Sequence, residues 1–353
     1  MAANYVYRTF HDESLSLDGK ALLVTGATGS FGRAFIDSVL KCFKPRRLIV
    51  FSRDEFKQSE MAERYQSGKH PSLRFFIGDV RDQSRLEMAM RDIDIVIHAA
   101  ALKQVPAAEY NPFECINTNV IGAENVVQAC MRAKVRNVIS LSTDKAANPI
   151  NLYGASKLAS DKIFVSANNI SGEDGPKFSV VRYGNVLNSR GSVIPLFRKL
   201  VRENAESIPI TDPEMTRFWI TLDQGISFVL SSLAMMQGGE IFVPKIPSMR
   251  ATEMADAIAP GMKQHCIGIR PGEKLNELMI TSDDARNTLE MDDRYIITPA
   301  FDFSGKSFRI PEGAKPVDPR FSYASDANKE WLDKESLLRL IEQQEDQPSL
   351  YGK

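Results

Sequence analysis

The sequence is poor in the features that would place it in a specialised class of protein. Its four cysteines are scattered without a CxxC pair, and its four histidines show no zinc spacing, so we expect neither a disulfide framework nor a metal site. No hydrophobic run reaches membrane-spanning length. The first residues carry acids and lack the apolar core of a signal peptide. These absences predict a cytoplasmic protein with reduced thiols and no membrane anchor.

Charge of either sign is not in excess. The 353 residues carry 44 Lys and Arg against 45 Asp and Glu, which gives a net charge of −1. Nucleic-acid-binding proteins usually present a basic face, so this balance gives that class no support. The composition, 43% hydrophobic and 25% charged, is ordinary for a globular protein. The length suffices for one large domain or two modest ones.

Short apolar strands alternate with helical segments through the first half of the chain. We expect strands over 20–25, 47–52, 73–77, 93–98, 137–142 and 178–183, and helices over 33–43, 117–133 and 153–168. This alternation predicts an α/β fold with a doubly wound parallel sheet of the Rossmann type. Ligands of such sheets bind beyond the carboxyl ends of the strands, where Asp79, Ala99, Thr143 and Gly184 fall.

The pattern changes after about residue 185, where loops are richer in proline and glycine and the elements become shorter. We therefore predict a nucleotide-binding Rossmann domain over 1–184, with 1–19 as an arm before the first strand. Residues 185–345 are predicted to form a smaller C-terminal substrate-binding lobe that is interleaved with the sheet. Residues 346–353 are expected to be a frayed tail.

A glycine-rich loop joins the first strand to the first helix. Gly26, Gly29 and Gly32 have the TGxxGxxG spacing. Gly26 permits a tight turn, Gly29 lets the backbone approach a pyrophosphate, and Gly32 permits close packing of the helix. The free N–H groups at the start of a helix bind phosphate. The loop therefore predicts a dinucleotide site, to which Thr28, Ser30 and Phe31 also contribute.

The end of the second strand bears on which dinucleotide is bound. An NAD enzyme usually has an acid there for the ribose 2′-hydroxyl, whereas this chain has Ser52, Arg53 and Asp54, followed by Lys57. Arg53 and Lys57 suit a 2′-phosphate, which favours NADP. The alternative, that both are solvated surface cations, leaves NAD open because Asp54 lies nearby. Further cofactor contacts are expected from Asp79 and Val80 beside the adenine, and from Ala99, Ala100 and Lys103 after the fourth strand.

Tyr153 and Lys157 are four residues apart and therefore share a helix face. Lys157 can hydrogen-bond the nicotinamide ribose. Its charge, with that of the oxidised nicotinamide, should lower the pKa of Tyr153 from about 10 toward neutrality. The phenolate can then take the proton of a sugar hydroxyl as hydride leaves the same carbon, with Thr143 binding that hydroxyl. Together with the glycine loop, these residues predict an oxidation that uses a nicotinamide cofactor.

These motifs lie within longer segments that carry a family resemblance. The segments are VTGATGSFG, FSRDEFKQSEMA, HAAALKQVP, STDKAANPINLYGASK, VVRYGNVLNSRGSVIP, MTRFWITLDQG, GEIFVPKIPS and IGIRPGEKLNE, and they extend from about Leu22 to Pro299. The chain resembles the extended short-chain dehydrogenase/reductases and, among them, the UDP-N-acetylglucosamine 4,6-dehydratases that invert C5. A related membrane-attached branch has methionine at the position of Tyr153, so the tyrosine points to the short soluble branch.

The resemblance implies an NADP-dependent carbon–oxygen lyase. The reaction would convert UDP-N-acetylglucosamine to UDP-2-acetamido-2,6-dideoxy-β-L-arabino-hex-4-ulose, the first step of pseudaminic acid synthesis for flagellin and surface glycans. Oxidation at C4 acidifies the C5 proton, water leaves across C5 and C6, and hydride returns to C6. The cofactor would be regenerated in each turnover and stay bound. A cytoplasmic homo-oligomer is also implied.

The same resemblance assigns Asp144 as the acid for the C6 oxygen and Lys145 as the base at C5, where ordinary dehydratases tend to have Asp-Glu. A lysine base must be neutral, and lowering its pKa from about 10.4 to about 7.5 costs about 4 kcal/mol. Burial, Lys157 and the nicotinamide charge favour that shift, whereas Asp144 opposes it. The alternative is that Lys145 anchors the substrate as a cation paired with Asp144.

Substrate contacts are expected from the loops after the fourth and sixth strands and from two later arginine motifs. Arg217 and Arg270 suit a diphosphate because a guanidinium binds it in a bidentate manner, and Glu273 suits a ribose hydroxyl pair. For each of these, a surface salt bridge is the alternative. The remaining candidates for the sugar and UDP are Lys103, Asn185, Ser189, Arg190 and Val193.

Two other functions are compatible with parts of this pattern. A UDP-sugar epimerase on the same fold would use Tyr153 and Lys157 but would not need Asp144 and Lys145. A non-catalytic NADP-binding regulator would typically lack the tyrosine or the lysine of the catalytic helix, and both are present here.

Overall fold

The computed structural model describes residues 6–12, 14–65, 69–187, 193–301 and 308–346. Its centre is a ten-stranded sheet. From one edge to the other the strands are β16 (Lys315–Pro316), β14 (Thr288–Glu290), β15 (Arg294–Ile297), β10 (Ile241–Pro244), β6 (Lys177–Tyr183), β5 (Asn137–Thr143), β4 (Ile95–His98), β1 (Ala21–Thr25), β2 (Arg47–Ser52) and β3 (Leu73–Ile77). The strands from β10 to β3 run parallel, whereas β14, β15 and β16 are joined antiparallel. The predicted doubly wound α/β fold is therefore confirmed.

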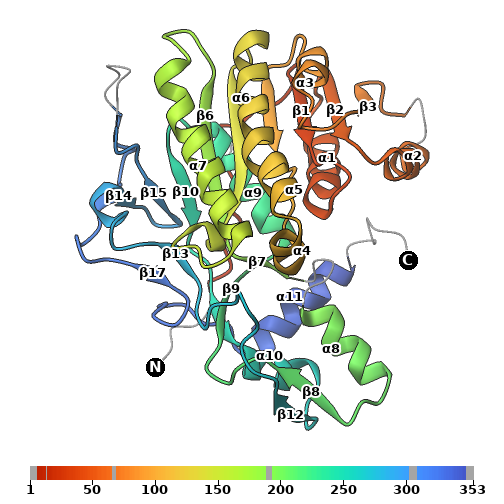
Figure 1. Ribbon diagram of the computed structural model, residues 1–353, viewed down its shortest axis with the longest axis vertical. Coiled ribbons are helices and arrows are strands. Elements are labelled where there is room, and N and C mark those ends of the chain that lie inside the picture. The colour runs from red at the N-terminus through yellow and green to blue at the C-terminus, as the bar shows by residue number, and fades with distance from the viewer. Residues whose placement is uncertain (1–5, 13, 66–68, 188–192, 302–307, 347–353) are drawn as a thin grey trace.

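Helices cover both faces of the sheet, so β1, β2 and β4 are buried along nearly their whole length. In Figure 1, α6 (Gly122–Ala133) and α7 (Leu152–Ile170) lie in front of the sheet, while α9 (Leu222–Met235) lies behind it. Helix α3 (Gln83–Ala89) packs beside α6, and α1 (Ser30–Cys42) packs beside α9. Helix α2 (Glu55–Arg64) packs near the β3 edge. The helix predicted from residue 117 begins with a π-helical turn at Asn117–Ile121 before α6.

A smaller lobe lies beyond the carboxyl ends of the parallel strands, in the lower part of Figure 1. It contains α8 (Val193–Arg202), α10 (Ala251–Ile258), α11 (Lys334–Asp346) and the parallel pair β8 (Ser207–Ile210) and β12 (Lys263–Cys266). Ile194, Trp219, Met254 and Leu337 belong to its own buried cluster. The later half of the chain supplies this lobe and also the strands β10, β14, β15 and β16 of the main sheet. The predicted domain boundaries stay a prediction.

Two small sheets connect the lobe to the main sheet. One holds β7 (Asn185–Val186), β9 (Thr216–Ile220) and β11 (Ser248–Arg250), and the other pairs β13 (Leu278–Ile280) with β17 (Tyr323–Ala324). Because β7 follows β6 at once, and Glu277 directly precedes β13, both sheets place side chains at the carboxyl edge of the main sheet.

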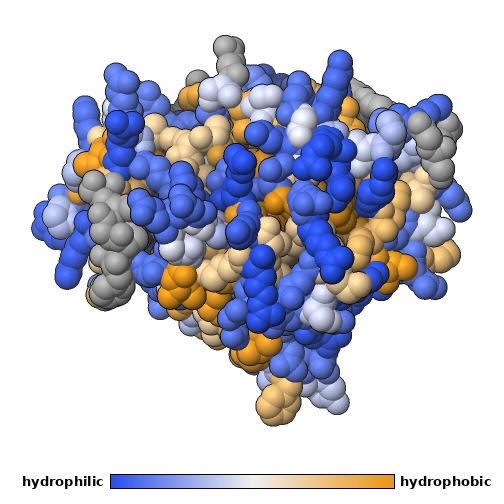
Figure 2. Space-filling model, turned by 90° about the horizontal axis from the view of Figure 1, so that it is seen from above, coloured by the Kyte–Doolittle hydropathy of each residue, from blue (hydrophilic) through white to orange (hydrophobic). Residues whose placement is uncertain are grey.

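The surface is mostly hydrophilic on the face that Figure 2 shows, with small separate hydrophobic patches. Tyr110 and Phe113 are the most exposed large hydrophobic side chains of the described residues. Within those residues, none of the helices combines the length and hydrophobicity needed to cross a bilayer.

Candidate active site

A cavity of about 1360 Å³ opens between the carboxyl edge of the sheet and the lobe. Drug-sized ligands usually occupy about 300–1,000 Å³, so this cavity has room for a dinucleotide and a second ligand. Its lining extends from the glycine loop after β1 to the Arg-Pro-Gly-Glu-Lys loop before β13. We refer to these two ends as the nucleotide end and the sugar end.

The glycine loop forms the wall of the nucleotide end. Gly26 has φ +64°, and a Cβ there would lie 2.8 Å from the main-chain nitrogen of Ala100. A Cβ on Gly32 would lie 2.4 Å from the Cα of Ala27, so α1 packs against the loop only because this residue is glycine. Helix α1 begins at Ser30, next to the cavity. The predicted loop residues that line the cavity are Gly26, Thr28, Gly29, Ser30, Phe31 and Gly32.

The end of β2 carries an arrangement of charges that bears on the choice of cofactor. Asp54 caps α2, because its carboxylate accepts a hydrogen bond from the main-chain nitrogen of Lys57 at 3.0 Å. It also pairs with the Lys57 ammonium at 2.5 Å. These two contacts hold the pKa of Asp54 below its ordinary value. Arg53 is 57% exposed and lies 3.8 Å from Asp79. Arg33, which the sequence did not single out, also lines the cavity here.

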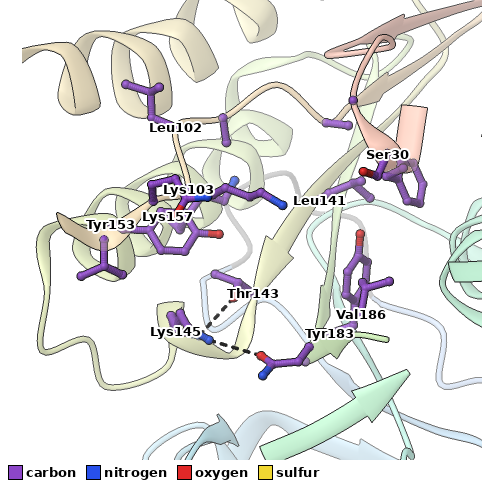
Figure 3. A pocket seen from close by; sticks show the side chains of 18 of the residues that line it. Ser30, Leu102, Lys103, Leu141, Thr143, Lys145, Tyr153, Lys157, Tyr183 and Val186 are labelled. Carbon is purple, nitrogen blue, oxygen red and sulfur yellow. Dashed lines mark hydrogen bonds between the residues drawn. The ribbon is translucent and has the colours of Figure 1, made fainter. Parts of the chain in front are cut away.

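The other residues predicted for the cofactor also line the cavity. They come from the ends of β2, β3 and β4 and from the loop before α4 (Val105–Tyr110). The residues are Ser52, Asp79, Val80, Ala99, Ala100 and Lys103. In Figure 3 the Lys103 side chain extends toward the same space as Tyr153 and Lys157.

Helix α7 brings the tyrosine and the lysine to the centre of the cavity. Its first turn is capped by Asn151, whose side chain accepts from the nitrogen of Gly154 at 2.7 Å and donates to the carbonyl of Gly272 at 2.7 Å. Gly154 packs so tightly that a Cβ there would lie 2.3 Å from the Lys145 carbonyl oxygen. This close approach places Tyr153 and Lys157 beside the Thr143–Lys145 segment (Figure 3).

The pKa of Tyr153 differs from the expectation. Burial raises it to about 12, although Lys145 and a hydrogen bond with Thr143 act in the opposite direction. Burial of the phenol thus outweighs the neighbouring cations from which a lower pKa was predicted. Burial also lowers the pKa of Lys157, against the attraction of Asp161.

Lys145 lies between two buried carboxylates. Its Nζ is 3.1 Å from Oδ1 of Asp144 and 3.2 Å from Oε1 of Glu277. It also lies 3.5 Å from Oδ1 of Asn185 (Figure 3). Burial lowers the pKa of Lys145, but the two carboxylates outweigh burial and raise it above its ordinary value. This direction is opposite to the shift that a neutral base requires.

Asp144 and Glu277 differ in their access to the cavity. Asp144 is fully buried and accepts a hydrogen bond from Thr143 at 2.8 Å; it is not among the lining residues, whereas Thr143, Lys145 and Glu277 are. The sequence analysis missed Glu277, although this residue ends the IGIRPGEKLNE segment on which the resemblance partly depends. Nothing in that segment alone indicates that its last acid reaches Lys145.

The arginines expected at the diphosphate have different surroundings. Arg217 donates to the carbonyls of Thr216, Leu275 and Lys274 at 2.7 to 2.9 Å. Its guanidinium therefore holds the loop before β13, and its contact with a diphosphate stays a prediction. Arg270 is 59% exposed and lies 3.7 Å from Glu273. Asn185, Val193, Arg270 and Glu273 line the sugar end, while Ser189 and Arg190 lie outside the described residues.

The fold and this site define an enzyme of the extended short-chain dehydrogenase/reductase class, with a Rossmann sheet and a substrate lobe over its carboxyl edge. Within that class, the chain belongs to the family described as polysaccharide biosynthesis protein, whose model matches residues 22–299.

Relatives of known name fit this membership. The chain is 54% identical over 327 residues to a UDP-N-acetylglucosamine 4,6-dehydratase (inverting) of Campylobacter jejuni, which covers 91% of this chain and 97% of the relative. It is 42% identical to a UDP-glucose 4-epimerase of Rickettsia bellii over 79% of this chain and 82% of the relative. The crystal structure of Pen from Bacillus thuringiensis is similar with a TM-score of 0.84 and 36% identity, over 94% of this chain and 99% of that one.

Proposed function

We propose that the protein is an inverting UDP-N-acetylglucosamine 4,6-dehydratase that works with a nicotinamide dinucleotide. The observation that carries the proposal is that a single cavity brings Tyr153 and Lys157 together with Lys145. The first two residues suit an oxidation, and Lys145 adds a group for removing a carbon-bound proton. The 54% identity of this chain to a UDP-N-acetylglucosamine 4,6-dehydratase (inverting) also supports the proposal. The product would be the 6-deoxy-4-keto sugar with C5 inverted, the first intermediate of pseudaminic acid synthesis.

The oxidation at C4 depends on the first turn of α7. A nicotinamide dinucleotide bound here would supply the hydride acceptor for C4 and the hydride donor for C6, and Lys157 would hold its ribose. Tyr153 accepts the proton of the C4 hydroxyl, and Thr143 orients that hydroxyl. Because burial raises the pKa of Tyr153 to about 12, the positive charges of Lys145 and of the oxidised cofactor are needed to stabilise the phenolate.

The elimination depends on the 143–145 segment. The C4 ketone acidifies C5, and Lys145 removes that proton. The C6 hydroxyl leaves as water after it gains a proton. Asp144 is buried behind the cavity wall, so its proton would reach the C6 oxygen through the hydroxyl of Thr143, to which it is hydrogen-bonded. Lys145 must be neutral to act, although its two carboxylate neighbours favour the ammonium form.

We favour NADP over NAD. Both carboxylate oxygens of Asp54 already accept hydrogen bonds from Lys57, which weakens the case for a ribose 2′-hydroxyl as its ligand. Arg33, Arg53 and Lys57 line the same part of the cavity and provide donors for a 2′-phosphate. The resemblance to the family further supports a homo-oligomer in the cytoplasm, and light scattering of the purified protein tests the oligomeric state.

Incubation with UDP-N-acetylglucosamine in D₂O, followed by proton NMR, tests the function. We expect a C6 methyl signal, deuterium at C5, inverted C5 configuration and no need for stoichiometric cofactor. A product that keeps the mass of the substrate and has an inverted C4 hydroxyl would instead support a UDP-sugar epimerase. The presence of Lys145 at the cavity favours dehydration because an epimerase has no carbon-bound proton to remove at C5.

A further inference from the structure

Glu277 is a buried acid at the sugar end to which the proposed function gives no role. It lies directly before β13, far in the sequence from Lys145, yet its Oε1 lies 3.2 Å from the Lys145 ammonium. Its side chain is only 3% exposed, and it lines the cavity. Burying a carboxylate is costly unless it is paired. The pairing with Lys145 offsets that cost, and it also places an acid beside the proposed base.

The main chain fixes Glu277 firmly. Its N–H donates to the hydroxyl of Ser325 at 2.9 Å, and its carbonyl accepts from the N–H of Ser325 at 2.9 Å. The Ser325 hydroxyl in turn contacts Oγ1 of Thr216 at 2.6 Å. Glu277 is thus held between β9 and the β13–β17 pair, and the carboxylate reaches Lys145 from a rigid support.

The carboxylate has one engaged oxygen and one free oxygen. Oε1 faces Lys145 and also lies 3.7 Å from Nε of Arg217. Oε2 is buried and has no hydrogen-bond partner among the described residues. An unpaired buried carboxylate oxygen is unfavourable, but the same oxygen can carry a proton without loss of an existing contact.

The charges around Glu277 make such protonation feasible. Burial and Asp144 raise its pKa, while Lys145, Arg217 and Lys274 oppose that rise. The two terminal nitrogens of Arg217 donate to main-chain carbonyls. The Lys274 ammonium donates to the carbonyl of Ala147 at 2.7 Å. Lys145 and Glu277 together can therefore hold one proton more than Lys145 alone, because the Glu277 carboxylate can also be protonated.

We propose that Glu277 positions Lys145 and takes over its surplus proton, so that the two residues act as one base. One proton moves from Nζ of Lys145 to the carboxylate of Glu277, and the neutral amine then accepts the C5 proton. After this step the pair has gained one proton, with an ammonium on Lys145 and a carboxylic acid at Glu277. The pair returns one proton when C5 is reprotonated. This inference rests on the proposed dehydration.

Glu277→Gln tests the inference because the amide keeps the shape of the side chain but cannot take the proton. The formation of reduced nicotinamide after mixing with UDP-N-acetylglucosamine follows C4 oxidation, and deuterium uptake at C5 follows proton removal. We expect C4 oxidation within about threefold of the wild type, while deuterium uptake and water loss fall at least about 100-fold. Reduced nicotinamide then accumulates.

The pH dependence separates a proton-transfer role from a structural one. In Glu277→Gln the Lys145 proton can no longer pass to Glu277, and Asp144 already accepts hydrogen bonds from Lys145 and Thr143. Loss of that proton to solvent should then limit the rate, so water loss should rise about tenfold per pH unit between about pH 7 and 9. The wild type should vary less over that range. Glu277→Asp keeps a carboxylate but shortens it, so its rate should fall at least about tenfold with a wild-type pH profile; this variant carries the test if Glu277→Gln does not fold.

Glu290→Gln is the matched control, because Glu290 pairs with Lys245 at 2.7 Å on β14, outside the cavity. This control should keep the wild-type rates. Wild-type deuterium uptake in Glu277→Gln, or a parallel loss of both steps with no rise at high pH, would overturn the inference. A wild-type protein that leaves UDP-N-acetylglucosamine unchanged would overturn the proposed function, and with it this inference.

Discussion

The two ends of the cavity are built in different ways. The nucleotide end comes mainly from successive strand ends between Gly26 and Lys103, and its shape depends on backbone, as the close contact of Gly26 with Ala100 illustrates. The sugar end gathers charged side chains from segments that are far apart in the chain, with Lys145 meeting Glu277 across the cavity wall. The backbone site depends on the pairing of neighbouring strands of one sheet, whereas the charged cluster depends on the contact of the segment before β13 with the end of β5.

The largest expected effect is on catalysis at the sugar end, with dinucleotide binding at the nucleotide end left intact. Lys145→Ala should reduce water loss from UDP-N-acetylglucosamine at least about 1,000-fold, because no other side chain replaces the proposed base. Dinucleotide affinity, measured by fluorescence titration, should stay within about threefold because the nucleotide end is untouched. Lys162→Ala, an exposed position on α7, is the control. Full turnover of Lys145→Ala would remove the assignment of the base.

The next largest effect is expected on stability, from the glycine that packs α7 against the Lys145 carbonyl. In Gly154→Ala the new Cβ would lie 2.3 Å from the Lys145 carbonyl, and forcing apart this packing should lower the free energy of unfolding by about 1–3 kcal/mol. Gly225→Ala in α9 is the matched control, because a Cβ there meets no atom within 4 Å. It should raise stability by up to about 1 kcal/mol through helix propensity. Urea unfolding measures both, and the same sign for the two variants would contradict the steric argument.

The same contrast explains what could be predicted from the sequence. The strands at 47–52 and 73–77 were predicted with the bounds that β2 and β3 have. The first is a buried, continuous apolar run, and the second is a mostly apolar run at the edge of the sheet. The glycine loop was placed correctly at the cavity because its signal is local.

The missed features all depend on tertiary contacts. Glu277 reaches Lys145 only through the pairing of β13 with β17, and Arg217 turns its donors toward main-chain carbonyls of a distant loop. The direction of the Tyr153 pKa shift depends on the burial of its phenol in the folded protein. Spacing in the sequence carries none of this information.

A charge at the nucleotide end gives an effect of intermediate size. Arg53→Ala should weaken NADP by about 10- to 100-fold, the usual cost of removing a charged hydrogen-bond donor, and NAD by less than about threefold. Titrations with both dinucleotides measure this. Arg46→Ala, a half-exposed arginine paired with Asp94, is the control. Equal weakening of both dinucleotides would remove the basis for preferring NADP.

The smallest expected effect concerns His98, the buried last residue of β4. Its ring contacts Oγ1 of Thr25 at 2.9 Å, and burial together with Lys157 lowers its pKa to about 3. A lowered pKa means that the folded state holds a neutral ring, so this site contributes full stability above about pH 6.5 and loses it as the pH falls toward about 3. Between pH 7.5 and 5.5 the loss should be about 1.4 kcal/mol.

Urea unfolding of the wild type and of His98→Gln at both pH values measures this loss. The variant should show a pH dependence that is weaker by about 1.4 kcal/mol, whatever its stability at pH 7.5, because packing losses do not change with protonation. His265→Gln, at an exposed position of β12, should keep the wild-type dependence. An unchanged slope in His98→Gln would mean that the ring is already charged in the folded protein. The cation of Lys157 would then have a charged neighbour beneath it, and the nucleotide end would contribute to the chemistry through charge as well as through backbone.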